Sequence, residues 1–400
     1  MRIGIVGNGL AGVIAAKTLR ELDADVEIVV FAQEPYHYYP RPNLIEYLAG
    51  NLPLERIFAF PEAWYKERGI VVRLETPVLE ISGNPPEVKT GAGGTERFDT
   101  LLLSDGASPA VPLSRGADKK GVFTLRTLDD ARNILDHLPT RSDVAILGGG
   151  LLGLEIGRAL LKRGARVEVV EFFDRLLPRQ LDPQGAAHLK SWIERLGLRV
   201  RLAVTTEEIL GDEDVCGLRF KGGERTAASM AILAAGAKPN IGLAQRAGLT
   251  VDRGVVVNDL LQTTHPRIFA AGDNICHRGR VYGIIPASFD QSRLAAANIL
   301  GGHKVYEGTV PTHTLKVAGL FVTSAGIITP PGPGFEEVCK EDRERGIYKK
   351  VLLQDGALVG AIWMGTKQGA AEISQAVAKR LSVGKWKGSL LEDDFDFGLL

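Results

Sequence analysis

The stretch IGIVGNGLAG at residues 3–12 decides the fold of this chain, and VAILGGGLLGLE at residues 144–155 repeats its pattern. In both stretches an apolar run leads into glycines spaced as G-x-G-x-x-G. The first glycine makes a tight turn from strand to helix, the second lets a pyrophosphate approach bare backbone, and the third lets the helix pack closely on the strand. The N-terminus of the helix then faces the phosphate charge. Two such stretches in one chain predict two sites that each bind a dinucleotide.

The composition is that of an ordinary globular protein of 400 residues, with 45% apolar and 24% charged residues. Basic and acidic residues both number 48, so no global field favours nucleic acid or an anionic membrane as a partner. No apolar run approaches the roughly 18 residues of a membrane span, and the first strand begins at once, which leaves no room for a signal peptide. The three cysteines, at positions 216, 276 and 339, have neither metal nor disulfide spacing. These features favour a cytoplasmic location.

The apolar spacing predicts the same strand–helix–strand order around each glycine stretch. The first unit is expected to have these elements over 2–6, 10–22 and 26–31, and the second over 143–147, 151–163 and 166–171. An apolar run at 268–271 and a helix over 289–300 return to the first unit. Beyond residue 311 the pattern changes to strand-like stretches and one helix over 369–381.

This order predicts an α/β fold with two Rossmann-like domains of the three-layer ββα type, the second inserted into the first. A C-terminal α+β domain follows them. The predicted domains are residues 1–110 with 240–310, residues 111–239, and residues 311–400, the last with an acidic tail.

The chain resembles the FAD-dependent pyridine-nucleotide reductases with the glutathione-reductase-like fold. Among these it is similar to NADH:rubredoxin oxidoreductases and to nitrite-reductase-type NADH flavoproteins. The likeness rests on both glycine stretches and on residues 39–42, 98–103, 232–240, 268–273 and 315–319. It implies FAD in the first domain and NADH in the second. It further implies a monomer or homodimer that passes electrons to a rubredoxin-like protein or a partner subunit.

The first site needs a carboxylate near the end of its second strand to accept hydrogen bonds from ribose hydroxyls, and Glu34 is the acid in reach. By resemblance, Arg41 contacts the adenine or diphosphate, Val78 the adenine, and Asp273 a ribityl hydroxyl. Each also has a purely structural alternative: a solvated loop acid, a surface arginine, a core valine and a helix cap. The predicted cofactor-binding residues here are Gly7, Asn8, Gly9, Leu10, Ala11, Gly12, Glu34, Arg41, Pro42, Val78, Gly272 and Asp273, and Ala107, Gly236 and Ile285 complete the cofactor-binding set.

In the second site, Gly148, Gly150 and Gly153 form the phosphate-binding turn, and Glu171 ends the second strand. A carboxylate there accepts from both ribose hydroxyls but repels a 2′-phosphate. Phe172 and Phe173 follow, and the nearest arginine is Arg175, so the sequence favours NADH over NADPH.

The route of the electrons after the flavin is predicted to avoid protein thiols. The first glycine-stretch helix has no cysteine, and Asn43 stands where several relatives carry a redox cysteine. Cys276 follows the Gly-Asp pair but is interpreted as structural, because free cysteines are among the most buried residues. By resemblance, Glu155 and Lys316 are the catalytic candidates, with a solvent-facing strand lysine as the alternative for Lys316.

One departure from the resemblance, the role of the tail and three functions remain open. Asp105 stands where relatives have threonine, and a carboxylate beside FAD phosphates is unfavourable unless it points away or is hydrogen-bonded. The tail at 390–400 has four acids within five residues and either packs on its own domain or docks on a partner. The chain is thus a reductase for a separate iron protein, a flavin-only NADH oxidase, or a non-catalytic flavoprotein subunit.

Overall fold

The computed structural model describes the chain except residues 92, 113–114, 139–141, 310–311 and 318, together with the side chains of 312–317. The chain forms two compact units. Unit 1 comprises Met1–Tyr47, Leu52–Ser108 and Ala237–Thr309, and unit 2 comprises Leu48–Asn51, Pro109–Gly236 and Val310–Leu400. The middle and C-terminal segments of the sequence therefore lie in one unit.

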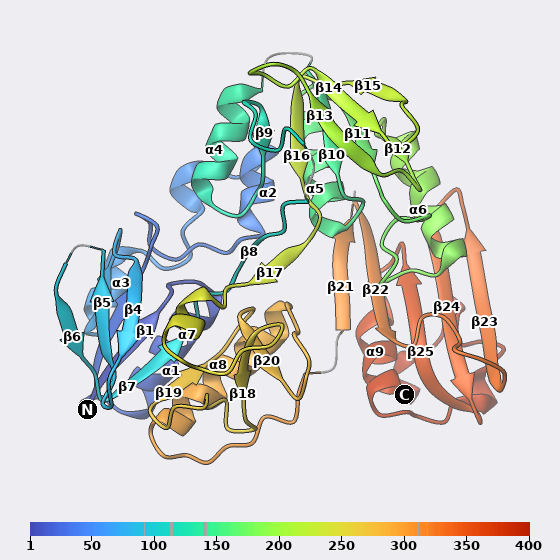
Figure 1. Cartoon of the computed structure of the whole chain (residues 1–400). Helices are drawn as coiled ribbons and strands as arrows, with labels where there is room; N and C mark the ends of the chain where they lie inside the picture. Colours follow the sequence, from blue (N-terminus) through green and yellow to red (C-terminus); the bar gives the residue numbers. More distant parts are fainter. Residues whose placement is uncertain (92, 113–114, 139–141, 310–311, 318) are drawn as a thin grey trace. The chain divides into compact units, whose positions relative to one another are not determined.

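Unit 1 is built on a five-stranded parallel sheet in the order β19-β7-β1-β2-β3 (Figure 1). Helices α1 (Leu10–Leu22) and α8 (Ile285–Ile299) pack against each other and against strands of this sheet. Because β19 pairs with β7 across an insertion of more than a hundred residues, the predicted return of the chain to its first domain is confirmed. The strands are β1 (Arg2–Val6), β2 (Glu27–Phe31), β3 (Ile70–Arg73), β7 (Thr100–Leu103) and β19 (Ile268–Ala270).

Smaller elements complete unit 1. A three-stranded antiparallel sheet contributes Ile81 and Val88 to the same apolar core as the large sheet. The elements are β4 (Val78–Ser82), β5 (Glu87–Thr90), β6 (Thr95–Arg97), β8 (Ala107–Pro109), β17 (Ala237–Pro239), β18 (Val255–Val257), β20 (Ile275–His277), α2 (Asn43–Leu48), α3 (Glu62–Glu67) and α7 (Gly242–Arg246), of which Leu48 and Pro109 belong to unit 2.

The first part of unit 2 repeats this plan with a parallel sheet in the order β12-β11-β10-β16-β9. Ala145 and Leu147 on β10 share an apolar cluster with the antiparallel sheet β13-β14-β15. Ile146, which alternates with them, faces α5, where it lies close to Gly153 and Gly157. The predicted three-layer arrangement is thus present. The elements are β9 (Val122–Phe123), β10 (Asp143–Leu147), β11 (Arg166–Val170), β12 (Arg199–Arg201), β13 (Thr206–Leu210), β14 (Gly217–Phe220), β15 (Arg225–Ala227), β16 (Met230–Leu233), α4 (Leu128–His137), α5 (Leu151–Lys162) and α6 (Pro183–Arg195).

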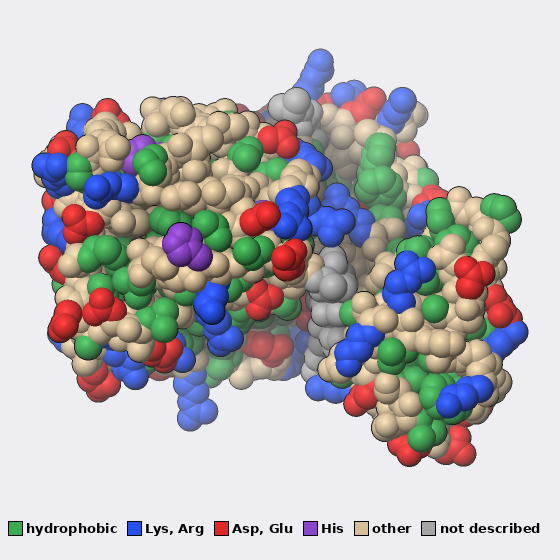
Figure 2. All heavy atoms as spheres, turned by 90° about the horizontal axis from the view of Figure 1, so that it is seen from below, with side chains coloured by type: hydrophobic (Ala, Val, Ile, Leu, Met, Phe, Trp, Pro, Cys, Tyr) green, Lys and Arg blue, Asp and Glu red, His purple; other side chains and the backbone are tan. Residues whose placement is uncertain are grey.

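The C-terminal part is the predicted α+β domain, an antiparallel sheet in the order β21-β22-β25-β24-β23 that packs on α9. Its elements are β21 (Thr312–Val317), β22 (Leu320–Gly326), β23 (Phe335–Asp342), β24 (Ile347–Gln354), β25 (Ala357–Met364) and α9 (Ala370–Ala378). In the part of the chain that the structure describes, no helix combines the length and apolarity needed to span a membrane. Basic and acidic side chains are interspersed on the face seen in Figure 2, in keeping with their equal numbers.

Helix α6 and strand β23 are absent from the sequence-based prediction, and the helix predicted over 289–300 begins earlier, at Ile285. The start of α6 does carry a helix signal, an aspartate N-cap followed by proline at the first position. Asp182 Oδ1 accepts from the backbone N–H of Gly185 at 2.9 Å. Its Oδ2 accepts from Tyr348 Oη at 2.9 Å and from Lys350 Nζ at 2.8 Å. A single buried carboxylate therefore caps α6 and joins it to β24.

The acidic tail packs on its own C-terminal sheet, which is the first of the two alternatives. Leu390, Leu391 and Phe395 belong to the apolar cluster of that sheet. Asp393 accepts from Lys349 Nζ at 2.8 Å, and this lysine is only 2% exposed and lies 4.8 Å from the centre of the Trp363 ring. The tail thus supplies the counter-charge for a buried cation.

Phe395→Ala is expected to destabilise the protein by about 3 kcal/mol, because it removes a buried ring from the C-terminal cluster. The thermal unfolding transition, followed by calorimetry, measures this loss. Asp394→Ala removes an exposed acid of the same tail and is expected to change stability by less than about 0.5 kcal/mol. Equal unfolding temperatures for Phe395→Ala and wild type would contradict a packed tail.

Candidate functional site

The first glycine turn has a backbone that only glycine fits at its first and third positions. Gly7 has φ +106°, and a Cβ there would lie 2.4 Å from the carbonyl oxygen of Ser104. A Cβ at Gly12 would lie 1.9 Å from the carbonyl oxygen of Gly7. At Gly9 a Cβ would meet nothing within 4 Å, so the middle glycine faces open space. This is the cradle that close approach of a phosphate requires.

The second glycine turn has the same geometry. Gly148 has φ +129°, with the carbonyl oxygen of Ala234 2.4 Å from a Cβ placed there. A Cβ at Gly153 would lie 2.0 Å from Gly148 O, and Gly150 again faces open space. The structure therefore places two equivalent cradles in two separate units.

Helices α1 and α5 begin without a side-chain cap and without an acid in their first turn. Their first N–H groups thus lack the partners that Thr127 and Asp182 supply at the starts of α4 and α6. An uncapped helix N-terminus behind a glycine turn favours a bound anion, and the diphosphate of a dinucleotide fits it.

Asn8 lies within the first cradle and carries an unused donor. Its Oδ1 accepts from Tyr65 Oη at 3.1 Å, and Tyr65 is itself buried. Its Nδ2 is buried without a hydrogen-bond partner among the described residues. Because an unpaired buried donor is costly, this amide group fits a ligand oxygen in the cradle.

The Gly272–Asp273 turn packs against the start of α1. Gly272 has φ +105°, and a Cβ there would lie 2.9 Å from Cβ of Ala11. Asp273 Oδ1 lies 3.5 Å from Ser288 Oγ on α8. The structure thus places the Gly272–Asp273 turn against Ala11 at the start of α1.

The sequence leaves open whether the Asp105 carboxylate points away from the phosphates or is hydrogen-bonded, and the structure shows that it is hydrogen-bonded. Its Oδ1 accepts from Asn274 Nδ2 at 2.8 Å, and its backbone oxygen accepts from Asn240 Nδ2 at 2.6 Å. Burial of the carboxyl raises its pKa to about 6. The hydrogen bonds to the carboxyl act in the opposite direction, but their effect is smaller. The neighbouring Ser104 Oγ lies 3.0 Å from Val6 O and 3.2 Å from Gly7 O, which ties this loop to the glycine turn.

The two strand-end acids have different partners. Glu34 pairs with Arg41, whose Nη2 lies 2.5 Å from Glu34 Oε1, and Tyr39 hydrogen-bonds to both. Glu171 is buried and instead holds the backbone of its own site: its Oε2 accepts from Gly149 N at 2.5 Å and its Oε1 from Phe173 N at 2.8 Å. Each carboxylate oxygen can accept a second hydrogen bond, so both acids keep capacity for a ribose hydroxyl.

The remaining predicted residues occupy buried, core and exposed positions. Ala107 is buried at the start of β8, Val78 packs on the core of unit 1, and Pro42 and Ile285 are exposed. Asn43 has a structural role, since its Nδ2 donates to Ile57 O at 3.1 Å. In unit 2, Gly236 has φ +109° and its carbonyl oxygen accepts from Ala110 N.

Glu155 lies on α5, two residues after the last glycine of the turn, with an ion-pair distance of 3.8 Å to Arg158. Strand β21, which carries Lys316, packs against α5. The structure therefore brings together the elements that carry the two catalytic candidates, while the side chain of Lys316 lies outside the described residues.

Cys276 is buried with its Sγ 3.8 Å from Asp252 Oδ2, whereas Cys216 and Cys339 are exposed. Among the described residues no group of three His, Cys, Asp or Glu side chains is placed to hold a metal ion.

Three side chains at the first site were not predicted from the sequence: Tyr65, Asn274 and Gln291. Each acts through a hydrogen bond to a residue more than fifteen positions away, so no local motif marks it. A buried amide on an apolar helix, as at Gln291, is the one signal that could have been found.

Two known protein families match this chain, one over its nucleotide-binding part and one over its C-terminal part. Residues 1–297 match the family model for pyridine nucleotide-disulphide oxidoreductases, and residues 311–381 match that for the C-terminal domain of rubredoxin NAD+ reductases. The solved structure of NADH:rubredoxin oxidoreductase from Clostridium acetobutylicum superposes with a TM-score of 0.81 at 27% identity, covering 95% of this chain and 96% of that one.

Two curated relatives differ from each other in function. A nitrite reductase [NAD(P)H] from Bacillus subtilis is 34% identical over 95% of this chain and 48% of its own length. An NADH oxidase from Methanocaldococcus jannaschii is 33% identical over 82% of this chain and 76% of its own length. The chain thus spans about half the length of the curated nitrite reductases that it matches.

Asp105→Asn is expected to stabilise the protein above pH 6 and to leave it unchanged near pH 4. The raised pKa means that the folded protein binds the proton more tightly than the unfolded chain, so stability falls as pH rises from about 4 to about 6. The loss amounts to about 3 kcal/mol, and asparagine avoids it. Chemical unfolding at a series of pH values measures the difference, with Asp394→Asn as an exposed control. A constant difference between Asp105→Asn and wild type across pH would contradict this account.

Proposed function

The chain belongs to the pyridine nucleotide-disulphide oxidoreductase family, and on that premise we propose that it is an NADH-dependent FAD reductase that delivers electrons to a separate small iron protein. The observation that carries the proposal is the duplicated cradle. Two glycine turns of equal geometry, each before an uncapped helix, fit two dinucleotides at once.

FAD is assigned to unit 1, where the cradle is joined by the Gly272–Asp273 turn. The open space at Gly9 and the unpaired Nδ2 of Asn8 support a diphosphate there. Arg41 and Glu34 would hold the adenosine end, and Asp273 the ribityl chain. The hydrogen bond that Asp105 Oδ1 accepts from Asn274 Nδ2 is the condition under which a carboxylate can stand beside the diphosphate.

NADH is assigned to unit 2. The two backbone hydrogen bonds to Glu171 hold its carboxylate at the strand end, and a fixed negative charge there disfavours a 2′-phosphate. Arg175, the nearest cation beyond the strand, has its Nη1 2.8 Å from Asp174 Oδ1. The charge of Asp174 offsets part of the attraction that Arg175 would have for a second phosphate.

When both are bound, FAD and NADH supply hydride transfer from nicotinamide to flavin. The chain's own residues would then orient the two rings and polarise them. Glu155 on α5 and Lys316 on β21 are the charged groups proposed for this role. No thiol takes part in this scheme, since Asn43 occupies the position of the redox cysteine and Cys276 is buried.

The acceptor is proposed to be a rubredoxin-like iron protein or a partner subunit. The match of residues 311–381 to the C-terminal domain of rubredoxin NAD+ reductases supports the first, and the nitrite reductase relative, twice as long, supports the second. The oxidase relative favours oxygen as the alternative acceptor. The scattered cysteines favour the cytoplasm as the site of action.

Anaerobic stopped-flow reduction by NADH, followed by mixing with rubredoxin or with oxygen, tests this function. We expect one FAD per chain, uptake of two electrons per flavin, and reoxidation by the iron protein that is much faster than by oxygen. Faster reoxidation by oxygen would favour the oxidase, and a failure of NADH to reduce bound FAD would favour the non-catalytic subunit.

A variant in which Cys216, Cys276 and Cys339 are all replaced by serine serves as the control for thiol chemistry. It is expected to keep NADH-to-dye electron transfer largely intact. If the wild type took up four electrons per flavin and the variant only two, electrons would pass through a thiol and the scheme would be wrong.

Glu171→Ala is expected to lower kcat/KM for NADH by about 10- to 100-fold, because it removes a charge-assisted hydrogen bond to the ribose and frees the N–H groups of Gly149 and Phe173. The value for NADPH should fall less, so that the preference for NADH shrinks. Glu168→Gln, on the same strand and paired with Arg201, is the control. Wild-type protein that prefers NADPH would contradict the role assigned to Glu171.

A further inference from the structure

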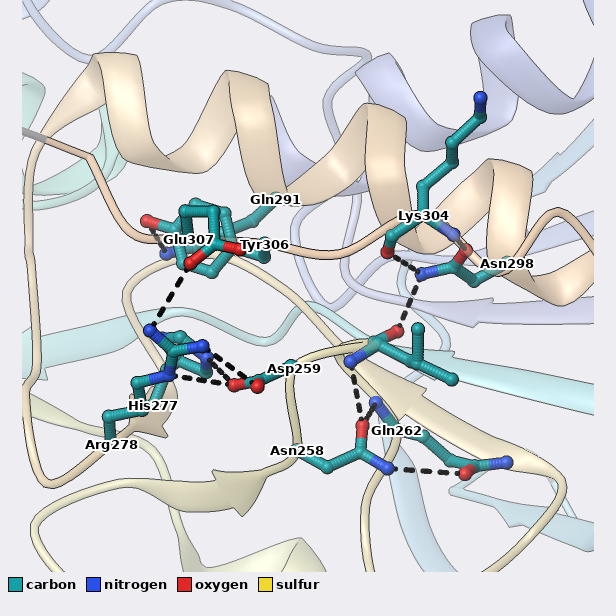
Figure 3. A network of polar contacts seen from close by, with 11 residues as sticks. Asn258, Asp259, Gln262, His277, Arg278, Gln291, Asn298, Lys304, Tyr306 and Glu307 are labelled. Carbon is teal, nitrogen blue, oxygen red and sulfur yellow. Dashed lines mark hydrogen bonds and ion pairs between the residues drawn. The ribbon is translucent and has the colours of Figure 1, made fainter.

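Helix α8 carries two fully or nearly buried amide side chains that bind different parts of unit 1. Gln291 is 0% exposed, its Oε1 accepts from the backbone N–H of Gly272 at 2.9 Å, and its Nε2 donates to Tyr306 Oη at 3.1 Å. Figure 3 shows Gln291 beside Tyr306, above the strand that carries His277. One side chain therefore contacts both the turn of the proposed FAD site and the segment that leads out of unit 1.

Tyr306 is itself held from several sides. Its hydroxyl lies 2.9 Å from Thr309 Oγ1, and its ring packs on the buried His277 with 4.9 Å between centroids. His277 Nε2 lies 2.9 Å from Asp259 Oδ1, which also pairs with Arg278 (Figure 3). The segment from Tyr306 to Thr309 is thus fixed to the core, and Gln291 is its link to Gly272.

We propose that Gln291 is a positioning residue that couples FAD binding at the Gly272–Asp273 turn to the order of the segment Tyr306–Thr309. The inference rests on the proposed function, since it takes FAD as the ligand of that turn. Without Gln291 the Gly272 N–H would lose its partner in a buried turn with positive φ, and the turn that carries Asp273 would lose one of its contacts with α8. Because coupling between two sites is reciprocal, bound FAD must also steady the segment that Gln291 holds.

Asn298 on the same helix provides a matched control. It is 8% exposed, and its Nδ2 donates to Lys304 O at 2.7 Å and to Leu260 O at 2.9 Å. Figure 3 shows these bonds at the other end of the network from Gln291. Replacing Asn298 therefore removes a buried amide of α8 without removing a bond to the Gly272 turn.

The experiment compares Gln291→Leu, Tyr306→Phe and Asn298→Leu with wild type in the full chain. The dissociation constant of FAD, from quenching of its fluorescence, is expected to rise about 10- to 100-fold in Gln291→Leu, by a smaller factor in Tyr306→Phe, which removes the coupling alone, and less than about threefold in Asn298→Leu. Amide hydrogen exchange gives the second readout. FAD is expected to slow exchange at 306–309 in wild type and in Asn298→Leu, but not in Gln291→Leu or Tyr306→Phe.

Two results would overturn the proposal. One is an equal loss of FAD affinity in Gln291→Leu and Asn298→Leu, which would reduce Gln291 to a generally stabilising residue. The other is wild-type exchange at 306–309 that FAD does not change. Wild-type protein that binds no FAD at all would instead contradict the proposed function, so the two failures are distinguishable.

Discussion

The close approach of a helix to the turn before it is the constraint on which both halves of this structure depend. A side chain of even one carbon at Gly12 or Gly153 would lie about 2 Å from the carbonyl oxygen of the first glycine of its turn. Glycine at these positions lets the helix start directly at the carboxyl edge of the sheet. The uncapped N–H groups, the strand-end acid and the returning Gly272 turn can then converge on one place.

The sequence predicts the parts of the fold that local patterns encode. The strand–turn–helix units, the inserted second domain and the return at β19 are all marked by apolar runs and glycines. Helix α6 was not predicted, although Asp182 and Pro183 signal its start, because its residues are on average less apolar than those of α1 and α5 and it packs against β24 from a distant part of the chain. The roles of Asn8, Asp105 and Gln291 depend on partners brought by the fold, and no spacing reveals those.

Glu34 and Glu171 occupy the same position in the repeated motif but bind different partners. Glu171 binds the backbone of its own glycine turn and is buried, whereas Glu34 pairs with an arginine of a following loop. The second residue of each turn matches this difference, since Gly149 leaves room for the carboxylate and Asn8 adds a side-chain donor. A tightly held cofactor and an exchangeable co-substrate would place such different demands on two otherwise equivalent turns.

The carboxylate of Asp182 also bears on how such proteins recombine during evolution. Because it caps α6 and binds Lys350 and Tyr348 of β24, the nucleotide domain depends on the C-terminal sheet for two partners of a buried anion, whereas Lys350 also pairs with Glu337 of its own sheet. A gene fusion that replaced the C-terminal sheet would leave the buried carboxylate of Asp182 without Lys350 and Tyr348. The two modules are therefore expected to be inherited together, and an engineered chimera must transplant the aspartate, lysine and tyrosine as a set.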